Sequence, residues 1–177
     1  MNHHETMIDV LKKRFGDKEI SGIEIGTGGG GLPAAIMLFC KNVFSLITID
    51  PYKHQDGVEF ESGWPQDKLD ETREIAIKRL AEYGDKITML HMGSSEAFEL
   101  INTNIKPGST VDFVWIDGNH TPDQVAKDLE YEKFIRPGGL IGGHDFGQVP
   151  LLTDVIKAKY GDKINTGADF TWWVFIN

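Results

Sequence analysis

The sequence predicts an α/β fold, a mostly parallel sheet of seven strands with helices on both faces. Short apolar runs typical of buried strands alternate with segments of helical period along almost the whole chain. A glycine-rich turn at 26–31 follows the first of these runs, and several runs end on an acidic residue. Because parallel strands require helical crossovers, we expect these strand ends to share one edge of the sheet.

The first half of the chain is expected to supply two strands with a helix between them. In chain order the expected elements are an amphipathic helix at 8–15, a strand at 20–25, a helix at 32–40 and a strand at 43–49. The next segment, 51–66, has no clear period and contains glycine and proline, so we expect a loop. Loops of this length often cover a substrate, which makes it a candidate lid.

The second half continues the alternation and closes with two antiparallel strands. The expected elements are a helix at 69–83, a strand at 87–92, a helix from 93, a strand at 111–116, a helix at 122–135, a strand at 140–143, a helix at 151–160 and closing strands near 163–166 and 170–176. Thr121 and Gln124 have the spacing of a capping box. The closing strands lack a connection of crossover length, so we expect them to pair antiparallel.

Length, charge and cysteine content limit the classes of protein that fit. A chain of 177 residues suits one domain, 1–177, and no stretch is long and apolar enough to cross a membrane. The net charge of −9 argues against nucleic acid as the main partner. The lone Cys40 and the polar start of the chain suggest a cytoplasmic protein. His3 and His4 are interpreted as part of a solvated terminus.

Four acidic residues, Glu24, Asp50, Asp117 and Asp145, end predicted parallel strands. Carboxylates gathered on one sheet edge repel one another unless a cation or hydrogen-bond donors intervene. They therefore predict a ligand with hydroxyl groups and positive charge, a metal ion, or both. The distance of Asp50 from the glycines suits an acid that accepts hydrogen bonds from ribose hydroxyls. This pattern fits a nicotinamide dinucleotide as well as S-adenosylmethionine, although a dehydrogenase usually adds a substrate domain.

The motifs in order make the sequence similar to class I S-adenosylmethionine-dependent methyltransferases. Glu24-x-Gly26-x-Gly28-x-Gly30 resembles their first motif, and the run from Val114 to His120 and the run from Gly138 to Asp145 resemble the small O-methyltransferase group that includes macrocin and related sugar methyltransferases. Catechol O-methyltransferases are more distant relatives. The resemblance covers residues 20–176 and implies a Rossmann-like sheet of order 3-2-1-4-5-7-6.

The resemblance also implies which residues hold S-adenosylmethionine. The implied cofactor-binding residues are Glu24, Gly26, Thr27, Gly28 and Gly30 for the amino-acid end, Asp50 for the ribose, Pro51 and Tyr52 beside the adenine, Gly93, Ser94 and Ser95 at the adenine edge, and Asp117 near the methyl group. His54 and Trp64, in the loop, could cover an acceptor. The acceptor is expected to be a small molecule, and a homodimer that completes the site remains open.

Two roles are implied for the acids and histidines after the fourth and fifth strands. His120 replaces a catalytic lysine of catechol-type relatives, and a histidine suits a base near neutral pH. Asp117 beside it is expected to raise its pKa, and His144 is a second candidate base. Metal-dependent relatives ligate magnesium at the positions of Asp117, His144 and Asp145. Because magnesium prefers oxygen ligands, magnesium, a softer ion and no metal remain open. The alternatives to methyl transfer are an NAD(P)-dependent oxidoreductase and a cofactor-binding module without turnover.

Overall fold

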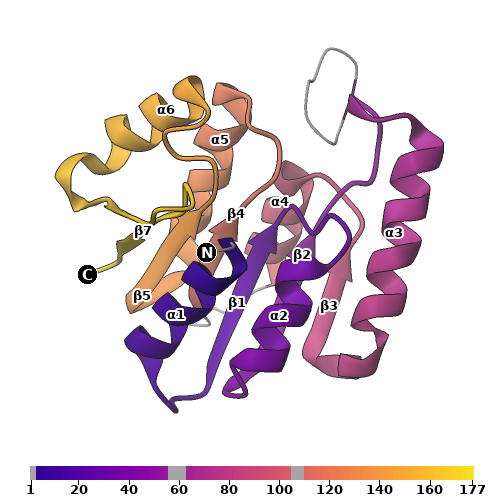
Figure 1. Ribbon diagram of the computed structural model, residues 1–177, viewed down its shortest axis with the longest axis horizontal. Helices are drawn as coiled ribbons and strands as arrows, with labels where there is room; N and C mark the ends of the chain where they lie inside the picture. Colours follow the sequence, from indigo (N-terminus) through magenta and orange to yellow (C-terminus); the bar gives the residue numbers. More distant parts are fainter. Residues whose placement is uncertain (1–2, 56–62, 105–109) are drawn as a thin grey trace.

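A single seven-stranded sheet organises the computed structural model, which describes residues 3–55, 63–104 and 110–177. The strands follow the order β3-β2-β1-β4-β5-β7-β6 (Figure 1). Strands β1 to β5 pair in parallel, whereas β7 runs antiparallel to both β5 and β6. The predicted fold class, strand order and antiparallel closing pair are confirmed.

The bounds of the elements follow the predicted alternation. The strands are β1 (Ile20–Ile25), β2 (Val43–Ile49), β3 (Ile87–Leu90), β4 (Val111–Ile116), β5 (Ile135–Gly143), β6 (Asn165–Thr166) and β7 (Trp172–Phe175). The α-helices are α1 (His3–Phe15), α2 (Gly31–Phe39), α3 (Gln66–Leu80), α4 (Ser94–Asn104), α5 (Pro122–Asp128) and α6 (Pro150–Tyr160). Short 3-10 helices follow three of them: η2 (Ala81–Lys86), η3 (Leu129–Phe134) and η4 (Gly161–Lys163).

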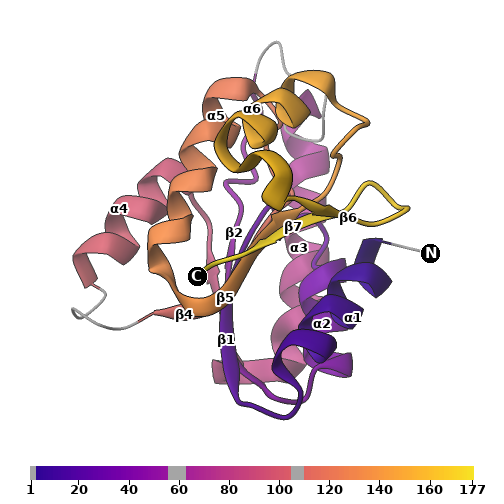
Figure 2. The ribbon, with the colours of Figure 1, turned by 90° about the vertical axis from the view of Figure 1, so that its left-hand side faces the viewer.

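Helices cover both faces of the sheet, which Figure 2 shows nearly edge-on between α1–α3 and α4–α6. Strand β4 illustrates why both faces need a cover, since all six of its residues are buried. Phe113 and Trp115 pack on the side of α1 and α2, whereas Val114 and Ile116 pack on the side of α4 to α6. Each such side chain contributes roughly 1.5–3 kcal/mol when buried. The centre of the sheet therefore fixes where the strand ends lie.

Helix α1 begins earlier than the predicted range of 8–15. Met7 is fully buried and extends the apolar stripe by one turn, and Thr6 Oγ1 donates a 2.6 Å hydrogen bond to Asp169 Oδ2 near the end of the chain. The interpretation of His4 as part of a solvated terminus is wrong, because this ordered helix carries it to the wall of a cavity. No helix in the described ranges is long and apolar enough to cross a bilayer.

The capping box predicted at Thr121 and Gln124 does not form. Thr121 makes no side-chain cap bond, and its backbone N–H instead donates to Asn119 Oδ1 at 2.9 Å. The amide of Gln124 instead donates to Ser94 at the start of α4 and to Asp128 four residues further along α5. Of the candidate lid at 51–66, residues 56–62 lie outside the described residues.

Candidate functional site

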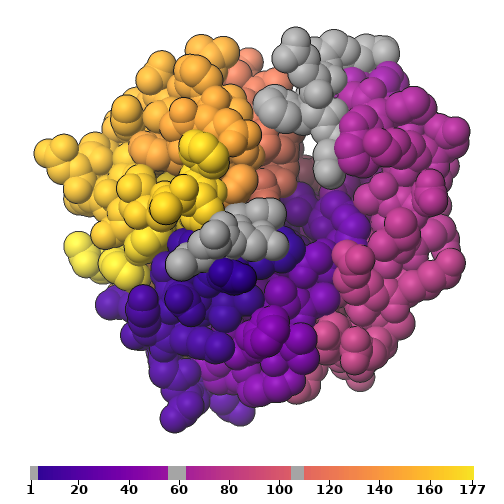
Figure 3. Space-filling model, viewed as in Figure 1, coloured from indigo at the N-terminus to yellow at the C-terminus, as the bar shows by residue number. Residues whose placement is uncertain are grey.

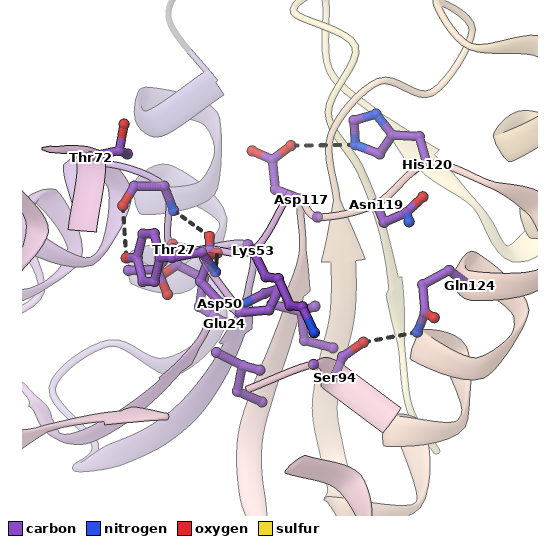
Figure 4. A pocket seen from close by; sticks show the side chains of 18 of the residues that line it. Glu24, Thr27, Asp50, Lys53, Thr72, Ser94, Asp117, Asn119, His120 and Gln124 are labelled. Carbon is purple, nitrogen blue, oxygen red and sulfur yellow. Dashed lines mark hydrogen bonds and ion pairs between the residues drawn. The ribbon is translucent and has the colours of Figure 1, made fainter. Parts of the chain in front are cut away.

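The carboxyl ends of the parallel strands open into a cavity of about 690 Å³. The face drawn in Figure 3 is hollowed between the orange part of the chain and the magenta α3. All four predicted strand-end acids, Glu24, Asp50, Asp117 and Asp145, line this cavity, together with the glycine turn. The sequence therefore places its acids on one shared edge, as expected, and Figure 4 shows three of them facing a common space.

Backbone hydrogen bonds hold the three central strand ends together beneath the cavity. Gly26 N–H donates to Ile49 O and Asp117 N–H donates to Ile25 O, both at 2.8 Å. Gly26 has a φ of 94°, and a Cβ at this position would lie 2.0 Å from Asp117 O. Only glycine permits this approach of β1 to the end of β4.

Most residues of the glycine turn line the cavity, whereas one of its glycines packs against α3. Gly26, Thr27, Gly28, Gly29 and Gly31 line the cavity. Gly30, which was also predicted to hold the cofactor, is not among the lining residues. A Cβ on Gly30 would lie 3.2 Å from the Leu80 side chain, so this glycine allows α2 and α3 to pack closely. The sequence could not distinguish these two uses of glycine.

Asp50 connects the second strand to the glycine turn through backbone donors. Its Oδ2 accepts from Gly28 N–H and its Oδ1 accepts from Tyr52 N–H, each at 2.9 Å. The Tyr52 hydroxyl in turn donates to Gly28 O at 2.9 Å. Burial raises the pKa of Asp50, although these hydrogen bonds partly offset that effect. Each carboxylate oxygen keeps a second lone pair for a ligand hydroxyl.

Glu24 is a buried acid with unused hydrogen-bonding capacity. Its side chain is 1% exposed, and Oε2 has no hydrogen-bond partner among the described residues. Burial raises the pKa of Glu24 well above its usual range, and the nearby carboxylates of Asp117 and Asp50 raise it further. A positively charged ligand group beside Glu24 would relieve this cost.

Helices α4 and α5 form one side of the cavity, and a network of polar side chains lies there. Ser94 Oγ donates to Asp128 Oδ1 at 2.6 Å, and Gln124 Nε2 donates to the same oxygen at 2.9 Å. Tyr131 donates its hydroxyl to Ser94 O at 2.6 Å. Ser94, Ser95, Gly93 and Gln124 line the cavity, and Figure 4 shows Ser94 and Gln124 side by side. Asp128 thus orients two wall residues from behind.

Replacing Asp128 with asparagine is expected to flatten the pH dependence of stability. Burial raises the pKa of Asp128 from 3.8 to about 6, so the native state binds a proton that the unfolded chain has released between these values. Stability therefore falls as pH rises through this window. The cost is about 3 kcal/mol at most, at about 1.4 kcal/mol per unit of pKa difference.

The Asp128→Asn variant should accordingly be more stable than the wild type at pH 8, by about 1–2 kcal/mol, because its unpaired amide offsets part of the gain. Urea unfolding at pH 4.5 and pH 8 measures this difference. Asp123→Asn, an exposed acid on the same helix, is the matched control. Equal pH slopes for the wild type and Asp128→Asn would contradict the prediction.

Two histidines and two aspartates form a chain of contacts on the other side of the cavity. His120 Nε2 lies 3.2 Å from Asp145 Oδ2 and 3.9 Å from Asp117 Oδ1. His144 Nδ1 lies 3.1 Å from Asp145 Oδ1, and His144 Nε2 bonds Asp169 O at 2.8 Å. Asp145 has a φ of 63°, a strained value for a non-glycine residue that is typical of functional sites.

The two histidines have opposite pKa shifts. Burial lowers the pKa of His120, which is 9% exposed, and outweighs the opposing effect of Asp145. The pKa of His120 is therefore lowered overall, and not raised as the presence of Asp117 led us to expect. Burial also lowers the pKa of His144, but the hydrogen bond to Asp145 and the charge of Asp117 outweigh it and raise this pKa overall. At neutral pH His120 is thus the unprotonated ring, as a base requires.

The ligand set that the resemblance implies, Asp117, His144 and Asp145, differs by one residue from the cluster in the structure. In the described part of the chain, the cluster whose ligand atoms lie within 4.8 Å of one another is Asp117, His120 and Asp145, with His120 in the place predicted for His144. Both oxygens of Asp145 already contact a histidine ring. Magnesium prefers oxygen ligands, and this cluster offers two carboxylates and an imidazole nitrogen. An imidazole with two carboxylates suits a softer ion better.

The structure adds cavity residues that sequence reasoning missed. They include His4, Lys53, Gln55, Leu69, Thr72, Glu96, Asn119 and Gln124. Asn119 Nδ2 donates to Gln55 Oε1 at 2.8 Å, which joins two loops at the cavity. His54 and Trp64 instead contact each other, through His54 Nδ1 and Trp64 O at 2.8 Å, and neither lines the cavity. The position of Asn119 within the run that ends in His120 was a signal that could have identified it.

Comparisons with known proteins bear on this geometry. The family model described as a methyltransferase domain matches residues 23–146, and no curated protein matches the chain. CalS11, a TDP-rhamnose 3′-O-methyltransferase in calicheamicin biosynthesis, superimposes with a TM-score of 0.68 at 10% identity, over 96% of this chain and 77% of its own.

Two further solved structures resemble the chain. TomG from Streptomyces achromogenes, an O-methyltransferase of tomaymycin synthesis solved with S-adenosylmethionine, gives a TM-score of 0.61 at 17% identity, over 98% of this chain and 79% of its own. A protein from Clostridium thermocellum described as an rRNA methylase gives 0.64 at 14% identity, over 98% and 94%. At these identities the likeness shows the fold alone.

Proposed function

Because this chain belongs to the methyltransferase domain family, we propose that it transfers a methyl group from S-adenosylmethionine to a hydroxyl group of a small molecule. The observation that carries the proposal is the shared cavity of Glu24, Asp50 and Asp117 beside the glycine turn. These residues offer what the cofactor requires: an acid for a cation, an acid for ribose hydroxyls and close access to backbone.

The buried acids support the fit of the cofactor. Glu24 Oε2 lacks a partner among the described residues and would accept a hydrogen bond from the ammonium group. Asp50 lies at the end of β2 with lone pairs for two ribose hydroxyls. Ser94 and Gln124 line the opposite side, where an adenine would lie. S-adenosylmethionine supplies an already electrophilic methyl group, so the protein has to align the acceptor and remove a proton.

His120 is the residue we assign to proton removal. Its lowered pKa keeps the ring neutral near pH 7, and its place beside Asp117 and Asp145 would stabilise the charged ring that forms when it accepts the hydroxyl proton. His144, held by Asp145 and the carbonyl of Asp169, would position Asp145. This assignment involves no metal ion.

A small-molecule acceptor has support from charge and from two structural neighbours. The net charge of −9 disfavours binding to a nucleic-acid backbone. CalS11 and TomG are O-methyltransferases of biosynthetic pathways, whereas other neighbours are described as rRNA methylases. Transfer of a labelled methyl group to a panel of phenols and sugars, with ribosomal RNA in a parallel assay, separates these substrate classes.

Calorimetric titration tests the cofactor directly. Both S-adenosylmethionine and its demethylated product, S-adenosylhomocysteine, are expected to bind at micromolar concentrations. No binding of either at millimolar concentration would contradict the proposal. Quenching of NADH fluorescence on binding would favour the oxidoreductase alternative instead. Cofactor binding without transfer to any acceptor would favour a binding module.

Turnover is expected to survive removal of divalent metal. Because His120 would remove the proton without help and the acid–histidine cluster suits magnesium poorly, dialysis against EDTA should leave kcat within about twofold of its starting value. The rate of labelled methyl transfer before and after dialysis measures this. A loss that added Mg²⁺ or Mn²⁺ restores would contradict the metal-free assignment.

A further inference from the structure

Among the described side chains of helix α1, His4 lines the cavity wall. The helix is fixed at this end by the hydrogen bond from Thr6 to Asp169 and by the burial of Met7, Ile8 and Leu11 in the core. His4 is therefore carried on an ordered element, although it lies far from the other cavity residues in the sequence.

His4 lies at the glycine turn where α2 begins. A Cβ built on Gly31 would lie 3.0 Å from His4 Cε1 and 3.8 Å from His4 Nε2. The same point is 3.7 Å from Arg79 Nη1, and that guanidinium donates to Gly29 O. An imidazole from α1 and a guanidinium from α3 thus flank the first residue of α2.

The amino end of α2 adds backbone donors at the same place. Gly31 and Leu32 both line the cavity, and the N–H groups of a helix's first turn have no partner within the helix. The helix dipole makes this end positive. Burial lowers the pKa of His4, and the charges of His144 and Arg79 lower it further. An anion bound beside His4 would offset this shift, because it would stabilise the charged ring.

A buried acid in the same cavity provides the opposite charge. Glu24 is 1% exposed, and its Oε2 has no hydrogen-bond partner among the described residues. The same cavity therefore presents an unpaired acceptor for a cation, Glu24 Oε2, together with donors for an anion at the start of α2. A free α-amino acid group carries both charges, on an ammonium and a carboxylate bonded to the same carbon.

We propose that His4 binds the carboxylate of the cofactor's amino-acid end, at the first turn of α2, and does not contact the methyl acceptor. This inference rests on the proposed function, because it assumes an amino-acid-bearing nucleoside as ligand. It assigns to α1 a direct part in cofactor binding, with Glu24 taking the ammonium group and His4 the carboxylate.

The test compares two ligands that differ in the amino-acid end. S-adenosylhomocysteine has this group, whereas 5′-methylthioadenosine has the same nucleoside thioether without it. Calorimetric titration of His4→Ala should show about tenfold weaker binding of S-adenosylhomocysteine, because a hydrogen bond to a charged group is lost. Binding of 5′-methylthioadenosine should not change. His4→Gln, which retains a side-chain donor, should recover part of the lost affinity.

Lys13→Ala, an exposed residue of the same helix, is the matched control and should bind both ligands as the wild type does. Equal weakening of both ligands by His4→Ala would overturn the inference, since His4 would then act only through the packing of α1. An unchanged affinity for S-adenosylhomocysteine with a raised KM for the acceptor would also overturn it. Failure of the wild type to bind either ligand would instead contradict the proposed function.

Discussion

The His120→Ala variant is expected to bind S-adenosylmethionine nearly as tightly as the wild type and to lose about 10²–10⁴-fold in kcat. His120 is buried beside Asp145 and Asp117, and it is the histidine whose lowered pKa leaves it neutral at pH 7. Removing it deletes the group that accepts the hydroxyl proton, while Glu24, Asp50 and the glycine turn keep their places. Calorimetry for binding and labelled methyl transfer for turnover measure the two effects separately.

The pH profile supplies a second readout for His120. The wild-type rate should fall as pH drops through a midpoint below 6.5, because protonation of His120 removes the base. In His120→Ala this limb should disappear, and the remaining rate should rise with hydroxide concentration. His54→Ala, an exposed histidine that does not line the cavity, is the control and should keep the wild-type profile. An unchanged kcat in His120→Ala would make this residue structural.

The Glu24→Gln variant is expected to move ligand affinity and stability in opposite directions. Loss of a hydrogen bond between the buried carboxylate and the ammonium group should weaken S-adenosylmethionine binding by about 10–100-fold. Without ligand, the same change should raise the free energy of unfolding at pH 7. Burial raises the pKa of Glu24, so the native state holds a proton that the unfolded chain releases, and ionising this group costs stability as pH rises.

Urea unfolding without ligand and calorimetry with ligand measure the two effects of Glu24→Gln. Asp123→Asn removes one acidic charge at an exposed position and controls for net charge. A variant that loses affinity and stability together would show that Glu24 supports the fold. Unchanged affinity for S-adenosylmethionine would remove Glu24 from the cofactor site.

The strands of the sheet could be predicted from the sequence because the local apolar pattern of each strand agrees with its burial in the fold. The apolar run from Val111 to Ile116 predicts a strand covered on both faces, and all six of its residues are buried. The residues that directly follow β1, β2 and β4 are Gly26, Asp50 and Asp117, and all three line the cavity. Placing the acids therefore needed only the rule that the ends of parallel strands share one edge of the sheet.

The parts of the site that sequence reasoning missed depend on contacts between distant segments. His4 reaches the cavity because Thr6 bonds Asp169, 163 positions away. Gln124 fits a capping box by spacing, but its amide donates to Asp128 one turn along α5 and to Ser94 on α4. The contacts of Thr6 with Asp169 and of Gln124 with Ser94 have no local signature. The geometric cluster with Asp117 and Asp145 likewise contains His120, whereas His144 Nε2 contacts the carbonyl of Asp169, 25 positions away.

The backbone bonds from Gly26 to Ile49 and from Asp117 to Ile25 have a consequence for how ligands enter and leave. They tie three adjacent strand ends into one floor, and we expect Glu24, Asp50 and Asp117 to keep their spacing when a ligand binds. Exchange of product for fresh cofactor is then expected to depend on the contact that joins the surrounding loops, the Gln55–Asn119 hydrogen bond. Substitutions at this pair should therefore alter the lifetimes of complexes, whereas substitutions in the floor should alter whether complexes form.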